Sequence, residues 1–195
     1  MLSESLIERF QSLLDEARAA GEPDPEAMNV ATQDADGRLS SRMVLLKGFD
    51  ARGFVFYTNT HSRKGRALAA HPAAALCVHW KHLREGVQVR AEGVIEAVTA
   101  AEADAYFATR PRGSQIGAWA SDQSQEMPSR FTFEERIAEF DKTFDGRDVP
   151  RPPHWSGYRI KPDRIEFWFG ARFRLHEREL HELVDGQWRM AYLFP

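Results

Sequence analysis

The segment Phe54-Val-Phe-Tyr-Thr58 decides the fold class of this chain. All five residues are aromatic or β-branched, which is the composition of a β-strand. Two further segments of this kind follow it, at Ala73 to Trp80 and at Val87 to Val98. Since short strand-like runs recur between turn residues, we predict a fold built mainly from a β-sheet.

Turn signals and further strands flank this segment on both sides. Asp36-Gly37 separates two strand-like runs, Met28 to Gln33 and Leu39 to Lys47, and therefore indicates a hairpin. Four more strands are expected near the C-terminus, at Tyr158 to Ile160, Arg164 to Phe169, Phe173 to Leu183 and Trp188 to Phe194. Because this many strands must close up or pair across a partner to cover their edges, we predict a predominantly antiparallel β-barrel.

Helices are expected at the periphery of this barrel. Apolar residues recur at helical spacing from Leu6 to Ala17, which predicts an amphipathic helix over residues 3–20. Shorter helices are predicted after the capping residues Ser62 and Thr99 and over Phe131 to Phe144. By contrast, residues 110–129 are predicted to form a polar, turn-rich stretch.

Length and composition are those of an ordinary globular chain. The 195 residues are 43% hydrophobic and 28% charged, so we predict one domain over residues 1–195, with the prolines at 150–153 as a connector inside it. A net charge of −3 provides no basic field for nucleic acid or an anionic membrane. No apolar run approaches the ~20 residues of a membrane span, and MLSESLIERF lacks the apolar core of a secretory signal. A cytoplasmic protein is therefore expected.

Several common kinds of site are not expected. The single cysteine, Cys77, excludes an intrachain disulfide and is predicted to be a small buried hydrophobe. His79 and His82 form an H-x-x-H pattern with no third ligand nearby, so no metal site is predicted. There is no G-x-G-x-x-G after a strand, no Walker loop and no G-x-S-x-G, which argues against a Rossmann unit, a P-loop and an α/β hydrolase.

Two basic clusters are candidates for phosphate binding. Ser62-Arg-Lys64 begins a predicted helix, where free N–H groups and the helix dipole favour an anion. Arg110, Arg112 and Ser114 place cationic and hydroxyl donors within five residues, and Tyr106 lies one helical turn before Arg110. The alternative for both clusters is a solvated basic turn or loop without a ligand.

Two further groups of cations lie on predicted strands. Arg42 and Lys47 bracket an apolar strand and, being five residues apart, point to opposite faces of a regular strand. Arg174, His176 and Arg178 share one face if their segment is also a strand, and the two arginines would then disfavour the charged form of His176. Exposed cations without a ligand remain open as the alternative for both groups.

In this order, the four clusters resemble the pyridoxamine 5'-phosphate oxidase family. The resemblance rests on R-x-V-L-L-K at 42–47, R-P-R-x-S-Q-I-G-A-W at 110–119, and E-F-W followed by R-L-H-x-R at 166–178. F-Y-T-N at 56–59 and S-R-K at 62–64 add to it, and the match covers the chain from about Pro25 to Pro195. It implies an FMN-binding split β-barrel that works as a homodimer, with FMN between the subunits.

The resemblance also implies roles for individual residues. FMN would be held by Arg42, Met43, Val44, Leu45, Leu46, Lys47, Tyr57, Thr58, Arg63, Lys64, Gln88, Gln123, Ser124, Trp168 and Arg178. The substrate phosphate would be held by Lys47, Tyr106, Arg110 and Ser114. Arg174 and His176 would lie over the pyridine ring as the catalytic residues and would favour the deprotonated, hydride-donating form of the substrate.

The implied activity is oxidation of pyridoxamine or pyridoxine 5'-phosphate to pyridoxal 5'-phosphate, with O2 as acceptor and H2O2 as product. Two alternatives remain: a related flavin oxidase acting on another ring, and a protein that binds FMN or pyridoxal phosphate without turnover. The chain departs from the family pattern at two places. It begins near its first predicted helix, without the family's basic, tyrosine-containing lid, and it has Tyr192 where relatives carry arginine. Closure of the site and the partner of that arginine are therefore expected to differ.

Overall fold

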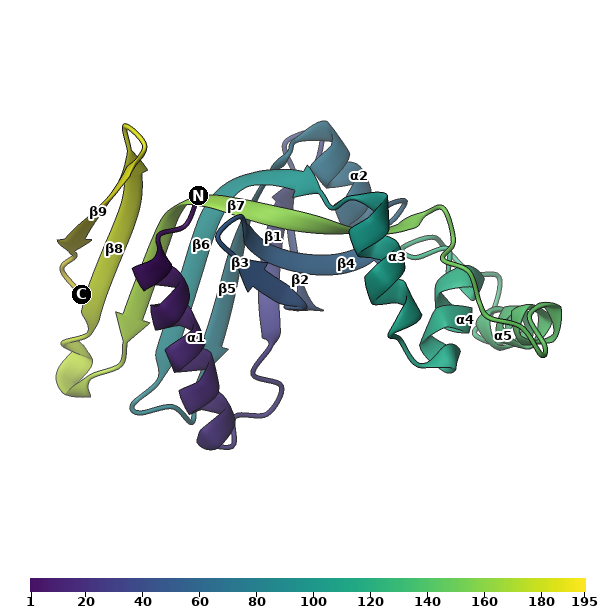
Figure 1. Cartoon of the computed structure of the whole chain (residues 1–195), viewed down its shortest axis with the longest axis horizontal. Coiled ribbons are helices and arrows are strands. Elements are labelled where there is room, and N and C mark those ends of the chain that lie inside the picture. Colours follow the sequence, from purple (N-terminus) through teal and green to yellow (C-terminus); the bar gives the residue numbers. More distant parts are fainter.

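The computed structural model describes residues 1–195, and its nine strands belong to one sheet. The strands are β1 (Ala27–Gln33), β2 (Leu39–Leu45), β3 (Gly48–Asp50), β4 (Gly53–Asn59), β5 (Ala73–Trp80), β6 (Val87–Ala97), β7 (Trp155–Phe169), β8 (Glu177–Val184) and β9 (Gln187–Tyr192). Hydrogen-bonded neighbours follow the order β2-β1-β5-β6-β7-β4-β3, with β8 between β7 and β9. Every pairing is antiparallel, and the sheet curls into a half-barrel (Figure 1). The predicted fold class is confirmed.

Five α-helices and one 3-10 turn surround the sheet. They are α1 (Glu4–Ala19), α2 (Arg63–Ala70), α3 (Ala100–Ala108), α4 (Arg112–Ala120), α5 (Phe131–Thr143) and the turn η1 (Arg172–Arg174). The predicted caps are confirmed: Ser62 accepts from the N–H of Gly65, and Thr99 forms a capping box with Glu102. None of the helices is long and apolar enough to cross a membrane.

Helix α4 corrects the prediction of a turn-rich stretch over residues 110–129. Two glycines, Gly113 and Gly117, lie within its nine residues and lower its intrinsic helix propensity, so the sequence pattern conceals it. Tertiary packing compensates, because Ile116 is buried in a small core with Phe107 and Trp155. The helix places the residues after Pro111 beside those at the end of α3.

Strand β7 organises the sheet and corrects a second prediction, since the two strands expected over residues 158–169 are one continuous strand. Its first half pairs with β4 and its second half with β8, while β6 pairs with it from Tyr158 to Phe169. The register shifts between Glu92 and Gly93, where an added Cβ on Gly93 would lie 2.1 Å from the carbonyl oxygen of Lys161. Glycine is therefore required at this bulge, and Pro162 is tolerated opposite it.

The segment before β8 corrects a third prediction. Residues 173–176 are not part of a strand, because Phe173 and Arg174 adopt left-handed backbone conformations with φ of 56° and 62°. The strand begins only at Glu177, so Arg174 and His176 do not share a strand face with Arg178. These two residues lie on the turn that leads into the strand.

The main core lies between α1 and the concave side of the sheet. Phe10 is 2% exposed and packs edge-to-face against Phe49 and Phe54, at centroid distances of 4.7 and 5.0 Å. Burying each large side chain of this kind stabilises the fold by about 1.5–3 kcal/mol. Cys77 is half-buried on β5, so it is less buried than the small buried hydrophobe that the sequence predicted. Its side chain alternates with the core-facing residues of that strand.

Candidate functional site

A cleft of about 670 Å³ opens between β2, β4, the start of α2 and the helices α3 and α4. It is lined by many of the residues that the sequence predicts for cofactor and substrate. These are Met43, Val44, Leu45, Lys47, Tyr57, Thr58, Lys64, Tyr106, Arg110, Ser114 and Gln123. The fold therefore brings together in one cleft predicted residues from Met43 to Gln123.

At one end of the cleft, Lys64 contacts only neutral groups. Its Nζ donates to Thr58 Oγ1 at 2.9 Å and to Gln123 Oε1 at 2.8 Å. Partial burial, together with the nearby charge of Arg42, lowers the pKa of Lys64 to about 8. The first turn of α2 contains no acidic residue that could compensate this charge. A cation held in this way favours a bound anion.

Arg42, next to the lining residue Met43 on β2, does not itself line the cleft and also lacks a carboxylate partner. Its guanidinium donates to the carbonyl oxygen of Val30 at 3.0 Å, to Thr32 Oγ1 at 2.9 Å and to Ser40 Oγ at 2.6 Å. Burial lowers its pKa, and the charge of Arg63 lowers it further. We refer to Arg42, Arg63 and Lys64 as the α2 cation cluster.

The other end of the cleft is formed by the α3–α4 turn. Arg110 lies over the ring of Trp155 at 4.8 Å and over that of Phe107 at 5.5 Å. Its Nη1 is buried and has no hydrogen-bond partner, and burial lowers the pKa of the guanidinium. Ser114 is exposed in the first turn of α4 and lines the same end. Arg112 turns away and donates to carbonyl oxygens near α5, so it does not join this end as the sequence suggested.

Three parallel aromatic rings, which we call the ring stack, line the wall between the two ends. Tyr57 lies 4.1 Å from Tyr106 and 5.2 Å from Trp155, with interplanar angles of 13° and 4°. Gly157, opposite Tyr57 on β7, makes room for it, because a Cβ there would lie 2.7 Å from the tyrosine ring. The stack holds Tyr106 at the edge of the cleft beside Arg110.

A second group of predicted residues lies far from the cleft, at the β8 end of β7. It consists of Gln88, Trp168, Arg174, His176 and Arg178. Trp168 pairs with both Gln88 and Arg178 across the sheet, and its ring lies 4.5 Å from that of His176. Trp155 in the cleft and Trp168 are at opposite ends of β7, about 40 Å apart along a strand that rises about 3.3 Å per residue. One chain therefore does not bring the two groups together (Figure 1).

Within this β8-end group the side chains are held by local partners. Arg178 donates from Nε to Glu166 Oε1 at 2.8 Å and from Nη2 to Oε2 at 3.1 Å, and Arg90 contacts the same carboxylate. Burial raises the pKa of Glu166, but the hydrogen bonds from Arg178 and Arg90 outweigh this effect, so the pKa lies below its usual value. The Nδ1 atom of His176 accepts from the N–H of Ala171 at 3.1 Å. Arg174 is exposed.

Four predicted residues, Arg42, Leu46, Arg63 and Ser124, are near the cleft in sequence but do not line it. The sequence missed lining residues that carry no charge: Asn59, Thr109, Pro111, Gly117, Ala118, Ser121, Phe133 and Trp155. Of these, Asn59 could have been found from the F-Y-T-N motif, since its Nδ2 donates to the carbonyl oxygen of Ser121 and so joins β4 to the end of α4. The remainder carry no signal beyond their position next to predicted residues.

The fold and the cleft define a class: a split β-barrel protein whose cleft is lined by cations without carboxylate partners. Residues 13–144 match the family described as pyridoxamine 5'-phosphate oxidase, and residues 155–195 match the pyridoxine 5'-phosphate oxidase C-terminal dimerisation region. The chain belongs to the pyridoxamine 5'-phosphate oxidase family. The family predicted from the sequence motifs is confirmed.

Curated relatives have high identity over nearly the whole chain. A pyridoxine/pyridoxamine 5'-phosphate oxidase of Myxococcus xanthus (strain DK1622) is 56% identical over 195 residues, covering 100% of this chain and 94% of the relative. One of the same name from Caulobacter vibrioides (strain NA1000 / CB15N) is 61% identical over 186 residues, covering 95% of this chain and 83% of the relative.

Solved structures agree with the fold. PhzG from Burkholderia lata 383, in complex with tetrahydrophenazine-1-carboxylic acid, has a TM-score of 0.88 and 32% identity, covering 98% of this chain and 91% of that one. A pyridoxamine 5'-phosphate oxidase-related, FMN binding protein from Nostoc punctiforme PCC 73102 has a TM-score of 0.77 at 16% identity, with full coverage of both chains. The second likeness concerns the fold alone.

Proposed function

We propose that this chain is an FMN-dependent oxidase that converts pyridoxamine and pyridoxine 5'-phosphate to pyridoxal 5'-phosphate, with O2 as acceptor and H2O2 as product. The observation that carries the proposal is that one cleft is lined at two places by a cation without a carboxylate partner. Lys64, the member of the α2 cation cluster that lines the cleft, lies at one place, and Arg110 lies at the other. Two phosphates, one on the cofactor and one on the substrate, account for both. The names of the curated relatives support the same activity.

The residues at the α2 end fit the phosphate of FMN. Lys64 is partly buried among Thr58, Ser62 and Gln123, which provide no negative charge, and Arg42 makes bonds only to neutral oxygens. A phosphate would supply the missing charge and accept from the side chains and from the start of α2. When bound, FMN supplies the two-electron redox chemistry that passes reducing equivalents from the substrate to O2.

The protein's own contribution is binding and orientation. Arg110 would pair with the substrate phosphate, a group that does not react, and Tyr106, Ser114 and Lys47 would donate hydrogen bonds to it. Fixing this remote group restricts the reacting end of the substrate to one place in the cleft. The planar wall of the ring stack restricts the ligand's approach to one side.

A homodimer would complete this site. The β8-end group is too far along β7 to reach the cleft of its own chain, whereas a two-fold partner could present it there. Gln88, Trp168 and Arg178 of the partner copy would then contact FMN, and its Arg174 and His176 would lie beside the substrate. The match of residues 155–195 to a dimerisation region supports this arrangement.

An oxygen-consumption assay with both phosphorylated substrates tests the proposal. The purified protein should be yellow, should retain FMN through gel filtration, and should release H2O2 with either substrate. A colourless protein that cannot be loaded with FMN would contradict it. A yellow protein that is reduced only by an unphosphorylated ring, such as a phenazine precursor, would instead favour a PhzG-like substrate. A yellow protein that reacts with neither would favour a binding protein without turnover.

A further inference from the structure

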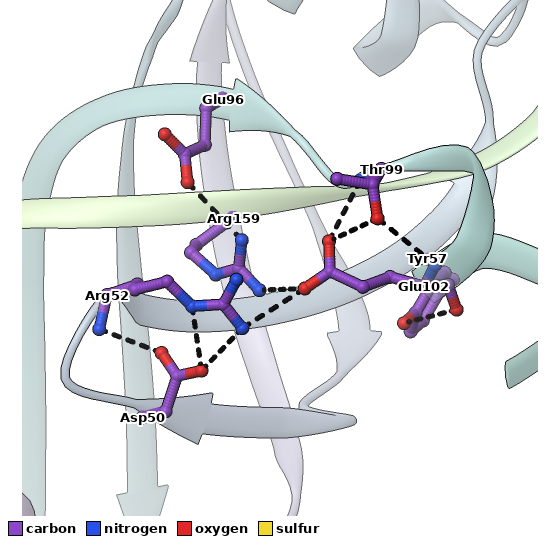
Figure 2. Close-up of polar contacts among 7 residues, drawn as sticks. All are labelled: Asp50, Arg52, Tyr57, Glu96, Thr99, Glu102 and Arg159. Carbon is purple, nitrogen blue, oxygen red and sulfur yellow. Dashed lines mark hydrogen bonds and ion pairs between the residues drawn. The ribbon is translucent and has the colours of Figure 1, made fainter. Parts of the chain in front are cut away.

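An ion-pair network joins the start of α3 to β7 and to the β3–β4 turn, outside the cleft (Figure 2). At its centre Arg159, which is 4% exposed, donates from Nη2 to Glu102 Oε1 at 2.8 Å and from Nη1 to Glu96 Oε1 at 3.3 Å. Arg52 reaches the same oxygen of Glu102 at 3.1 Å and is itself held by Asp50. The carboxylate of Glu102 therefore contacts two separate parts of the sheet.

The same carboxylate also fixes the helix to which it belongs. Glu102 Oε2 accepts from the backbone N–H of Thr99 at 2.9 Å and from its hydroxyl at 3.0 Å. Through these bonds, one side chain both caps α3 and ties its first turn to β7. The helix consequently has little freedom to rotate or slide on the sheet.

This network is connected to two residues that line the cleft, Tyr106 and Tyr57. Tyr106 follows Glu102 by four residues and so lies on the same face of α3, one turn further on. Tyr57 connects the two features, because its ring stacks on Tyr106 and its hydroxyl donates to the carbonyl oxygen of Glu102 at 3.5 Å. Arg110 lies just beyond the end of the same helix, over Trp155.

We infer that Arg159 and Glu102 are positioning residues for substrate binding, acting through the placement of α3. Their pair sets the Tyr106 ring in the stack and, beyond it, the guanidinium of Arg110. The inference rests on the proposed function in that these two residues hold the substrate phosphate. Neither Arg159 nor Glu102 lines the cleft, so neither touches the ligand itself. Displacement of a binding group by about 1 Å is enough to weaken a productive complex by one to two orders of magnitude.

The test uses Arg159→Met, Arg159→Lys and the shape-preserving Glu102→Gln in the FMN-loaded protein. Binding of pyridoxal 5'-phosphate is measured by titration calorimetry, and the ring stack is followed by near-ultraviolet circular dichroism. We expect the dissociation constant to rise about tenfold in Arg159→Met and Glu102→Gln, with partial recovery in Arg159→Lys. The near-ultraviolet signal of the stack should change in parallel, while FMN affinity stays within about twofold.

Leu13→Ala provides the matched control, because Leu13 is 4% exposed in the main core, which contains no residue of α3. It should lower the unfolding temperature without changing the near-ultraviolet signal or ligand affinity. Variants of the pair that lose only stability, as Leu13→Ala does, would overturn the inference. Should the unmodified protein bind no pyridoxal 5'-phosphate, the proposed function fails, whereas the spectroscopic comparison still decides whether the pair positions the stack.

Discussion

The cations in and beside the cleft differ from the cations that join strands and helices in what neutralises them. Arg42, Lys64 and Arg110 contact neutral oxygens or aromatic rings, and burial lowers the pKa of each. Arg159 and Arg178, in contrast, are each bound to a carboxylate, Glu102 or Glu166. Unpaired cations destabilise the protein without a ligand, whereas paired cations hold strands and helices in place. Pairing therefore distinguishes the cations in and beside the cleft from those that join strands and helices more clearly than burial does. Arg178, which we propose to contact FMN across a dimer interface, belongs by its pairing to the second group.

The largest expected effect is on the structural side of this comparison. Glu166→Gln keeps the shape of a side chain that is 3% exposed but leaves Arg90 and Arg178 without their shared negative charge. Removing one partner of a buried pair costs about 3–5 kcal/mol, and we expect the lower end because both arginines are partly exposed. Urea unfolding of the FMN-free protein measures this loss.

Glu182→Gln is the control for that experiment, because Glu182 pairs with Arg164 at 3.1 Å across the same two strands but at the surface. The Glu182→Gln substitution should lower the free energy of unfolding by less than about 1 kcal/mol. Equal losses of unfolding free energy in Glu166→Gln and Glu182→Gln would mean that the buried ion pairs of Glu166 stabilise the sheet no more than a surface pair does.

The next largest effect is on the binding side. Arg110→Ala should raise the KM for pyridoxamine 5'-phosphate about 10- to 100-fold, because a charged hydrogen bond to the phosphate is lost. The free energy of unfolding should change little, since this guanidinium has no carboxylate partner to leave behind. Steady-state oxygen consumption and urea unfolding of the same preparation measure the two quantities.

Arg112→Ala is the matched control, because Arg112 is two residues away but donates to the carbonyl oxygens of Phe144 and Arg147. It should lower stability and leave KM unchanged. Loss of FMN from Arg110→Ala would show instead that Arg110 belongs to the cofactor end of the cleft.

A smaller effect should appear in the pH dependence of FMN binding. Lys64 has a pKa of about 8 in the free protein, and a bound phosphate would raise it. Below about pH 8 the lysine is already charged, so affinity is constant; above it, binding requires uptake of a proton, and affinity falls up to about tenfold per pH unit. The FMN phosphate is already fully ionised there, because its second pKa is near ~6.

Fluorescence titration of FMN between pH 7 and pH 10 tests this expectation. Lys64→Arg, which keeps its charge throughout that range, should give a flat profile. An identical decline in both proteins would place the titrating group elsewhere.

The smallest effect concerns acid stability. Hydrogen bonds from Thr99, followed by that from Arg159, lower the pKa of Glu102 to about 2. A depressed pKa contributes stability that is complete above the unfolded value of about 4.5 and is lost as pH falls towards 2. Glu102→Gln should therefore be less stable than the original protein at pH 7 and should approach it near pH 2. Urea unfolding between pH 7 and pH 2 measures the difference in unfolding free energy between the two proteins. A difference that does not narrow across that range would contradict the lowered pKa of Glu102.

Local patterns in the sequence predicted the antiparallel strands and most helix ends. Ser62 and Thr99 cap their helices as expected, since a capping side chain needs only its own backbone neighbours. Helix α4 escaped prediction because its stability comes from Ile116 in a tertiary core and not from the propensity of its glycine-containing sequence. The left-handed backbone at Phe173 and Arg174 escaped for a related reason, as neither residue type signals it.

The candidate residues were predicted as a set, but their arrangement was not. Motif spacing identified Lys64, Arg110 and Arg178, yet nothing in the spacing indicates that the first two share a cleft while the third lies at the far end of a strand. Nor does sequence show which cations are paired. Arg159 stands in no motif, and its partners Glu96 and Glu102 are more than 50 residues away. Such pairings depend on the sheet register and therefore require the structure.

The length of β7 has a consequence for inheritance. With one end of the strand in its own cleft and the other in that of a two-fold partner, each chain would contribute to both active sites of a dimer. In a dimer of Arg110→Ala copies, or in one of Arg178→Ala copies, both sites would be impaired. In a mixed dimer the two defects would fall in the same site and leave the second site intact. Two damaged alleles in one cell should therefore give more activity than either provides by itself.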